Sequence, residues 1–196
     1  MIYTKEHWKG SVITSPLPPT LVTCAHDGKV NVLTVAWTGI LCTRPPVTYI
    51  SVRPERYSYE LIKQSGEFVI NLPTKELVRA VDWCGVRSGA KYDKFEHCRL
   101  HTEDCVNVAV PMISECPVSI ECKVREVVSL GSHDMFIADI VGINAARELL
   151  DESGKLCLEK ADLIAYAHGD YFDLGKKLGN FGYSVRKNKK RTSKKR

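Results

Sequence analysis

Hydrophobic and polar residues alternate with a period of two along much of the chain, a pattern typical of half-buried β-strands. The runs that predict strands are residues 20–26, 29–38, 47–53, 67–72, 117–129, 134–144 and 161–167, the last of which also fits a short helix. Asp27-Gly28 joins the first two runs and is the dipeptide that a type I′ hairpin turn prefers. The pattern therefore predicts strands that neighbour one another through hairpins.

Two short helical patterns interrupt the strands. Pro54 suits the first position of a helix that Gly66 is placed to end. Thr74 can cap a second helix before Gly85, and residues 86–115 are rich in loop formers. Helices inserted among hairpins favour a mainly β, antiparallel barrel over a doubly wound sheet. The sequence also has neither GxGxxG nor GxxxxGK[ST], the two common nucleotide-binding loops.

The positive charge of the chain is concentrated at its C-terminal end. The formal net charge is +5, but residues 186–196 (RKNKKRTSKKR) carry eight cations and no anion. Without them 20 basic residues face 23 acidic ones, so the body is mildly acidic. We expect one domain over residues 1–185 and a disordered basic tail over 186–196. Binding of nucleic acid through this tail is the less favoured function, because eight charges predict only weak, salt-dependent association.

Eight cysteines occur without a CxxC pair. The N-terminal residues lack an apolar signal segment, and no run is long enough to span a membrane, so we expect a cytoplasmic protein with reduced thiols. His97, Cys98, His101 and Cys105 form the one patch that suggests a metal site. We favour a cysteine-containing loop there and predict no metal.

Candidate anion ligands gather after the strand 47–53. Arg53 and Arg56 precede a predicted helix, where cations are unfavourable unless an anion joins them. Backbone N–H groups, two guanidinium groups and the Ser58 hydroxyl would make a phosphate site. Pairing of the arginines with Glu55 is the alternative. A second basic segment, residues 87–95, either closes over the same anion or is a solvated charge cluster.

Five further residues suggest a ligand wall or redox chemistry. Thr34, Ala36 and Thr38 share a face of the predicted strand 29–38, and their small side chains would let a flat ligand approach, although they also suit an ordinary barrel wall. His133 lies at the turn of a long hairpin, where it could donate a proton, contact a redox partner or be a surface residue. Cys42 lies near the same wall, and a buried structural thiol is favoured over a redox-active one.

Several separated segments, in this order, resemble the flavin reductase-like family of FMN-binding split barrels, and within it the flavoredoxins. The segments are NVLTVAWTGILCTRPPVTYISVRPERYSYELIKQSGEFVINLP, SGAKYDKF, GSHDMFIADI and LGKKLGNFGYS. The resemblance covers about residues 10–185. It implies a Greek-key split β-barrel of six strands with a few helices, a homodimer, and one non-covalently bound FMN per subunit.

The resemblance also implies roles for individual residues. Thr34, Ala36, Trp37 and Thr38 would lie along the isoalloxazine ring, with Ser51 in the same wall. The FMN phosphate would be bound by Arg53, Arg56, Tyr57 and Ser58, with Lys91 and Lys94 in a second loop. His133 would face the nicotinamide and is the candidate catalytic residue.

Two functions follow from this resemblance. The first is an oxidoreductase that moves electrons from NAD(P)H through bound FMN to a flavin, a ferric or a protein acceptor. The alternative is a flavoredoxin-type electron carrier that does not react directly with NAD(P)H. The aromatic residues Tyr171, Phe172, Phe181 and Tyr183 would form part of a dimer contact, a lid over the flavin or ordinary core.

Overall fold

The first two alternating runs form the predicted hairpin. In the computed structural model of the protein, which describes residues 1–185, β1 (Thr20–His26) pairs antiparallel with β2 (Lys29–Val35). Asp27 and Gly28 have φ angles of 50° and 70°, as the two central residues of a type I′ turn require. The predicted basic tail, 186–196, lies outside the described residues.

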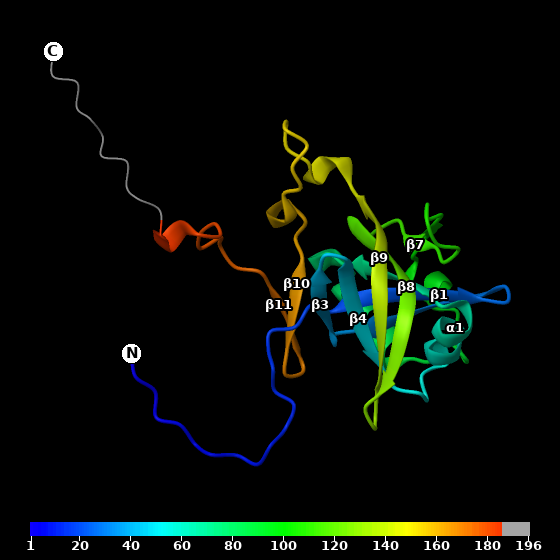
Figure 1. The fold of residues 1–196 in the computed structure, drawn as a ribbon, viewed down its shortest axis with the longest axis horizontal. Coiled ribbons are helices and arrows are strands. Elements are labelled where there is room, and N and C mark those ends of the chain that lie inside the picture. Colours follow the sequence, from blue (N-terminus) through cyan, green and yellow to red (C-terminus); the bar gives the residue numbers. More distant parts are fainter. Residues whose placement is uncertain (186–196) are drawn as a thin grey trace.

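Seven strands form the main sheet of the described chain, in the order β2-β1-β5-β8-β9-β4-β3. The other five are β3 (Thr38–Thr43), β4 (Pro46–Val52), β5 (Glu67–Leu72), β8 (Val118–Ser129) and β9 (Asp134–Ala145). Figure 1 shows β3, β4, β9 and β8 of this sheet side by side. All neighbouring pairs are antiparallel. β2 and β3 lie at opposite edges, yet only Ala36 and Trp37 connect them. A connection of two residues can join the edges only if the sheet curls on itself, so the predicted antiparallel barrel is confirmed.

The prediction of one strand over residues 29–38 is wrong. β2 pairs with β1 only as far as Val35, which lies opposite Thr20 at the beginning of β1. The chain then changes partner, and Thr38 pairs with Ile50 of β4. Thr34, Ala36 and Thr38 therefore do not share a face of one strand. Because β3 is a separate strand, the main sheet has seven strands and not the six that the resemblance implied.

Three α-helices and four 3-10 helices accompany the strands in the described chain. They are α1 (Tyr57–Ser65), α2 (Val78–Val86), α3 (Lys94–Cys98), η1 (Lys75–Leu77), η2 (Arg147–Leu149), η3 (Leu158–Lys160) and η4 (Tyr183–Val185). Two small sheets pair β6 (Thr102–Glu103) with β7 (Met112–Ile113), and β10 (Ile164–Ala167) with β11 (Asp170–Asp173). The segment 86–115, predicted to be rich in loops, also contains the short elements α3, β6 and β7.

The helix ends are only partly as predicted. Gly66 ends α1 in the left-handed conformation, with φ 69°, as expected. Pro54 is not the first helical residue, because the Arg56 N–H bonds to the Arg53 carbonyl in a turn and α1 begins at Tyr57. Thr74 makes no side-chain capping bond.

Two apolar clusters hold the helices against the sheet. The first fills the barrel beneath α1 and includes Val22, Leu33, Ile50, Val52, Ile62, Phe68, Ile70 and Phe136. The second joins the outer face of β1 and β2 to α2 and α3 through Leu21, Val32, Val81, Cys84 and Leu100. α1 and α2 therefore pack near the β2 edge, and their ends are held beside the crossing at Ala36-Trp37.

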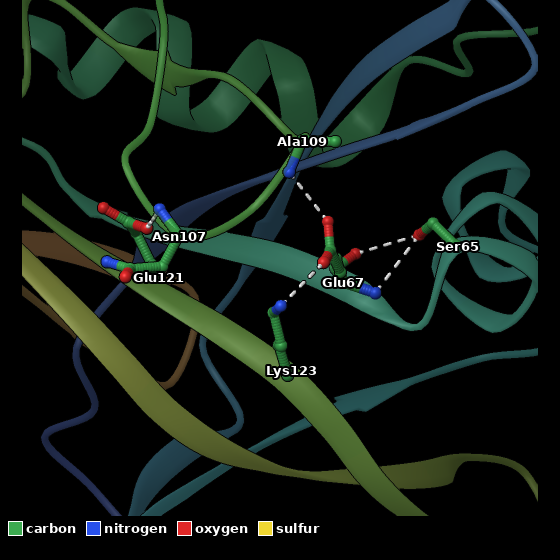
Figure 2. Close-up of polar contacts among 6 residues, drawn as sticks. All are labelled: Ser65, Glu67, Asn107, Ala109, Glu121 and Lys123. Carbon is green, nitrogen blue, oxygen red and sulfur yellow. Dashed lines mark hydrogen bonds and ion pairs between the residues drawn. The ribbon is translucent and has the colours of Figure 1, made fainter.

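Two glutamates fix the loop before β7 onto the sheet (Figure 2). Glu121 is fully buried and accepts hydrogen bonds from the backbone N–H groups of Val106 (3.2 Å) and Asn107 (2.6 Å), and from Asn144 Nδ2 (2.7 Å). Glu67 accepts one from the Ala109 N–H at 2.8 Å. Burial would raise the pKa of Glu121, but these donors hold it below its ordinary value.

Candidate functional site

A cavity of about 340 Å³ opens where the two edges of the curled sheet meet; we call it the crossing cavity. Thr34, Ala36 and Trp37 line it from the crossing, and Ser51 and Arg53 line it from the end of β4. Its other walls include Arg56, Asp82, Gly85, Val86, His133, Tyr166, Gly169 and Tyr171. The break in the sheet therefore makes a hollow with a wall of small residues.

A second cavity of about 340 Å³, the basic cavity, adjoins the first. The two share Leu33, Thr34, Arg53, Arg56 and Gly85. The basic cavity is also lined by Asn31, Glu55, Tyr57, Ser58, Cys84, Arg87, Ser88, Gly89 and Lys94. Because their walls are shared, the cavities form one elongated site, with small and aromatic residues at one end and cations at the other.

Four cations and one carboxylate line the basic cavity. Arg53 pairs with Glu55 at 3.3 Å, but both side chains are exposed, where such a pair contributes little stability. Arg56 donates from Nη1 to the Gly85 carbonyl at the end of α2, at 3.2 Å. The alternative in which Glu55 pairs with the arginines therefore holds for Arg53 alone.

Lys94 is the most deeply buried of these cations, with 3% of its surface exposed. Its Nζ donates to the Cys84 carbonyl at 2.7 Å, and no carboxylate of the described chain forms an ion pair with it. Burial, and then the charge of Arg56, lower the pKa of Lys94 from its ordinary value. A buried ammonium group without a counter-ion is unfavourable, and an anion in the cavity would relieve it.

The segment after α2 approaches this cavity closely. Asn31 Nδ2 donates to Ser58 Oγ at 2.7 Å, and both residues are buried. A Cβ added at Gly89 would lie 2.2 Å from Asn31 Oδ1 and 2.8 Å from Tyr57 Cδ1, which is too close for any side chain. The residues Arg87-Ser88-Gly89 thus wrap the cavity without filling it.

His133 and Trp37 meet at the other end of the site. Their ring centroids are 4.4 Å apart, and Ser132 Oγ lies 3.0 Å from His133 Nδ1. Burial, followed by the charge of Arg53, lowers the pKa of His133 from its ordinary value. The imidazole is therefore neutral at pH 7. The neighbouring Asp134 accepts a 2.5 Å hydrogen bond from the Tyr59 hydroxyl, which ties this hairpin to α1.

Two of the predicted site residues, Thr38 and Lys91, lie outside both cavities. Thr38 is buried within the sheet, where its hydroxyl donates to the Tyr49 carbonyl at 2.6 Å, and it lines neither cavity. Lys91 is exposed and also lines neither cavity. Thr34 lines both cavities, and its hydroxyl donates to the Val81 carbonyl of α2. The interpretation of Cys42 as a buried thiol is wrong, because this side chain is exposed on edge strand β3.

Several lining residues were given no role from sequence. Asn31 reads as one polar position in a strand, and its burial arises only when α1 and the segment 87–89 pack against it. Tyr166 and Gly169 come from the hairpin β10–β11, far along the chain. Of the aromatic residues singled out in this region from the sequence, Tyr171 alone lines the cavity. Its hydroxyl donates to Asp82, which also lines the cavity, at 3.4 Å. Phe172, Phe181 and Tyr183 are exposed.

The two histidines of the patch that suggested a metal site, His97 and His101, contact other side chains. The His97 ring stacks on Trp83 with centroids 3.9 Å apart, and His101 Nδ1 lies 2.5 Å from Glu115. Residues 1–185 contain no group of three or more His, Cys, Asp or Glu side chains arranged to hold a metal ion. Within the same range, every helix is too short or too polar to cross a membrane.

The structure is similar to two solved flavoredoxins. That of Desulfovibrio vulgaris (Miyazaki F) is 28% identical, with a TM-score of 0.87 over 93% of this chain and 100% of its own. That of Methanosarcina acetivorans is 26% identical, with a TM-score of 0.85 over 94% and 100%. An uncharacterized protein of Archaeoglobus fulgidus is 37% identical over 115 residues, which are 59% of this chain and 65% of that protein's length.

The family with the description "Flavin reductase like domain" matches residues 13–175. This range contains both cavities, all predicted site residues and all seven strands of the main sheet. The chain therefore belongs to the flavin reductase-like domain family.

Proposed function

We propose that the chain binds FMN non-covalently, with the phosphate in the basic cavity and the isoalloxazine ring in the crossing cavity. The observation that carries this proposal is the buried Lys94 ammonium group without a carboxylate partner. Arg53, Arg56, Tyr57 and Ser58 would complete the phosphate site. The shape also fits, because a flat ring needs the small residues of one end and a dianion needs the cations of the other.

The ring would lie beside Thr34, Ala36, Trp37 and Ser51. Thr38 would support that wall from within the sheet, and Lys91 is left out of the proposed site. Bound FMN accepts and releases one or two electrons, so the protein supplies position and electrostatics. The neutral His133 at the open end would contact the nicotinamide or exchange a proton there.

The proposed reaction moves electrons from NAD(P)H through bound FMN to a flavin, a ferric or a protein acceptor. Membership of the flavin reductase-like family supports this oxidoreductase function. The alternative is a flavoredoxin-type carrier without direct NAD(P)H turnover. The likeness to two flavoredoxins supports the carrier.

We also propose a homodimer in the cytoplasm. Ile40 on β3 and Ile143 on β9 are more than 60% exposed, and the C-terminal segment carries the exposed Leu178 and Phe181. In Figure 1 the segment after β11 extends away from the barrel. Pairing of two chains would cover this apolar surface. Eight free thiols suit a reducing compartment.

One experiment tests FMN binding and the electron donor together. The purified chain is titrated with FMN while flavin fluorescence is followed, and the complex is then mixed with NADH or NADPH in a stopped-flow instrument. We expect stoichiometric binding and bleaching of the flavin by one nicotinamide. Binding without bleaching would favour the carrier, and a failure to bind FMN would overturn both functions.

A further inference from the structure

Two cysteines meet beside the basic cavity. Cys84 lies in the last turns of α2, and Cys98 is the last residue of α3. Their Sγ atoms are 3.9 Å apart, in direct contact, and both are free thiols. A disulfide has an S–S distance of about 2.05 Å, so the sulfur atoms need to approach by less than 2 Å. A small rotation of α3, which has only five residues, can supply that movement.

We propose that Cys84 and Cys98 are a reversible dithiol–disulfide site, oxidised by low-molecular-weight disulfides, and that the disulfide weakens binding of the anion in the basic cavity. The second part of this proposal rests on the proposed FMN function, whereas the first part does not.

Accessibility determines the order of the exchange. Cys98 is half-buried and Cys84 is 1% exposed, so an external disulfide reaches Cys98 first. The Cys98 thiolate attacks one sulfur of the small disulfide, and the first small thiol leaves. Cys84 then attacks the Cys98 sulfur of the mixed disulfide and releases the second small thiol. Two S–H bonds of the protein are broken and one S–S bond is formed, and the small disulfide takes up both electrons and both protons.

Lys94 favours the thiolate forms that this exchange needs. Burial raises the pKa of Cys84 to about 12 and also raises that of Cys98, while the charge of Lys94 acts in the opposite direction on both. Both groups are therefore protonated at neutral pH, and the oxidation is slow there and faster in alkaline solution.

The same elements build the anion site. The Cys84 carbonyl accepts the hydrogen bond of Lys94 Nζ, and the next carbonyl, of Gly85, accepts that of Arg56. Lys94 and Cys98 are four residues apart in α3 and so lie on one face of that helix. Movement of Cys98 toward Cys84 therefore displaces Lys94 from the position in which it faces the cavity.

The test uses the full chain in buffers that contain reduced and oxidised glutathione in varied ratios. After quenching with an alkylating agent, mass spectrometry identifies the protected cysteines, and FMN is titrated into the fully reduced and fully oxidised forms. We expect a Cys84–Cys98 peptide cross-link that dithiothreitol reverses, and FMN binding weaker by roughly tenfold in the oxidised form, as for the loss of one charged hydrogen bond.

Variants separate this site from other thiols. Cys98→Ser should abolish both the cross-link and the redox dependence of FMN binding, whereas Cys157→Ser, which changes another half-buried thiol, should leave both unchanged. Absence of the cross-link in the wild-type chain would overturn the proposal. A cross-link with unaltered FMN affinity would overturn its second part, and a reduced chain that does not bind FMN would instead contradict the proposed function while the cross-link stands.

Discussion

The indole ring of Trp37 and the imidazole ring of His133 lie with centroids 4.4 Å apart and planes inclined by 35°. Trp37 belongs to the two-residue crossing between the sheet edges, and His133 precedes β9 at the tip of the longest hairpin. Both residues line the crossing cavity, and the charge of Arg53, which lines it too, acts on His133.

The first prediction concerns the protonation of His133. Its pKa lies below the ordinary 6.5, because burial and the charge of Arg53 disfavour the imidazolium. Arg53→Ala should raise this pKa, since the larger of the two charges that lower it is removed. Titration of the imidazole protons by NMR measures both values. Arg147→Ala, which removes a charge from η2, is the control, and a shift of equal size in both variants would contradict the assignment.

The second prediction tests His133 in the proposed reaction. His133→Asn keeps a polar side chain but cannot exchange a proton near neutral pH. We expect flavin reduction by the nicotinamide to slow on the order of 10²-fold, the lower end of general acid–base contributions, with FMN affinity unchanged. Stopped-flow rates and FMN titration separate the two effects. An unaltered rate would remove His133 from the reaction.

The third prediction compares two lysines in one segment. Lys94→Met removes the buried ammonium group, and FMN affinity should fall by about 1.5–3 kcal/mol, as for a lost hydrogen bond to a charged group. Lys91→Met removes an exposed charge that lines neither cavity and should leave affinity almost unchanged. Isothermal titration calorimetry measures both. Equal losses would indicate a general electrostatic effect instead of a phosphate contact.

The pH dependence of this comparison has a definite sign. In the free protein the pKa of Lys94 lies below 10.5, and a bound phosphate would raise it. FMN binding to the wild-type chain should therefore take up protons in alkaline solution, and affinity should decrease as the pH rises through the pKa of the free protein. The Lys94→Met variant should lack this proton uptake and the matching pH dependence of affinity. Calorimetry in buffers of different ionisation enthalpy measures the number of protons taken up on FMN binding.

Local pattern was sufficient for much of the fold. The turn at Asp27-Gly28, the end of α1 at Gly66 and the long strands β8 and β9 depend on neighbouring residues, and each was predicted close to its observed position. The break at Ala36-Trp37 was not predictable in this way. Alternation continues through it, and only the change of pairing partner from β1 to β4, a non-local event, ends the strand.

The candidate site likewise contains residues that the sequence could group and residues that only tertiary packing brings together. Arg53, Arg56 and Ser58 are close in sequence, so a helix N-terminus was enough to group them. The role of Asn31 depends on burial by α1 and the segment 87–89, and that of Tyr166 on a hairpin more than a hundred residues away. Sequence alone also could not separate Lys94 from Lys91, because only the packing of α3 buries one and exposes the other.

The fourth prediction uses the close approach at Gly89. An added Cβ would overlap Asn31 and Tyr57, so Gly89→Ala must displace the segment 87–89 or the Asn31–Ser58 hydrogen bond. We expect FMN affinity to fall by roughly tenfold or more, as when a charged hydrogen bond is lost, while the thermal unfolding transition stays cooperative. Gly175→Ala, where the added Cβ meets nothing within 4 Å, is the control. Unchanged FMN binding in Gly89→Ala would place the phosphate elsewhere.

The last prediction concerns the buried carboxylate of Glu121, whose three N–H donors hold its pKa below the ordinary 4.5 despite burial. A carboxyl group with a lowered folded-state pKa stabilises the fold fully above its unfolded-state pKa, and this contribution is lost as the pH falls through the folded-state value. Glu121→Gln should therefore reduce the free energy of unfolding at pH 7 by about 1.5–3 kcal/mol, the range for hydrogen bonds to a charged group.

The difference in free energy of unfolding between wild type and Glu121→Gln should narrow as the pH falls below the ordinary 4.5. There the carboxyl group of the unfolded wild-type chain takes up a proton, and the folded carboxylate follows at its lower pKa. Urea denaturation at pH 7 and at about pH 3.5 measures this difference. Glu126→Gln changes an exposed residue of the same strand and should be nearly neutral at both pH values. A difference that is independent of pH would mean that the size of the side chain, not its charge, holds the loop.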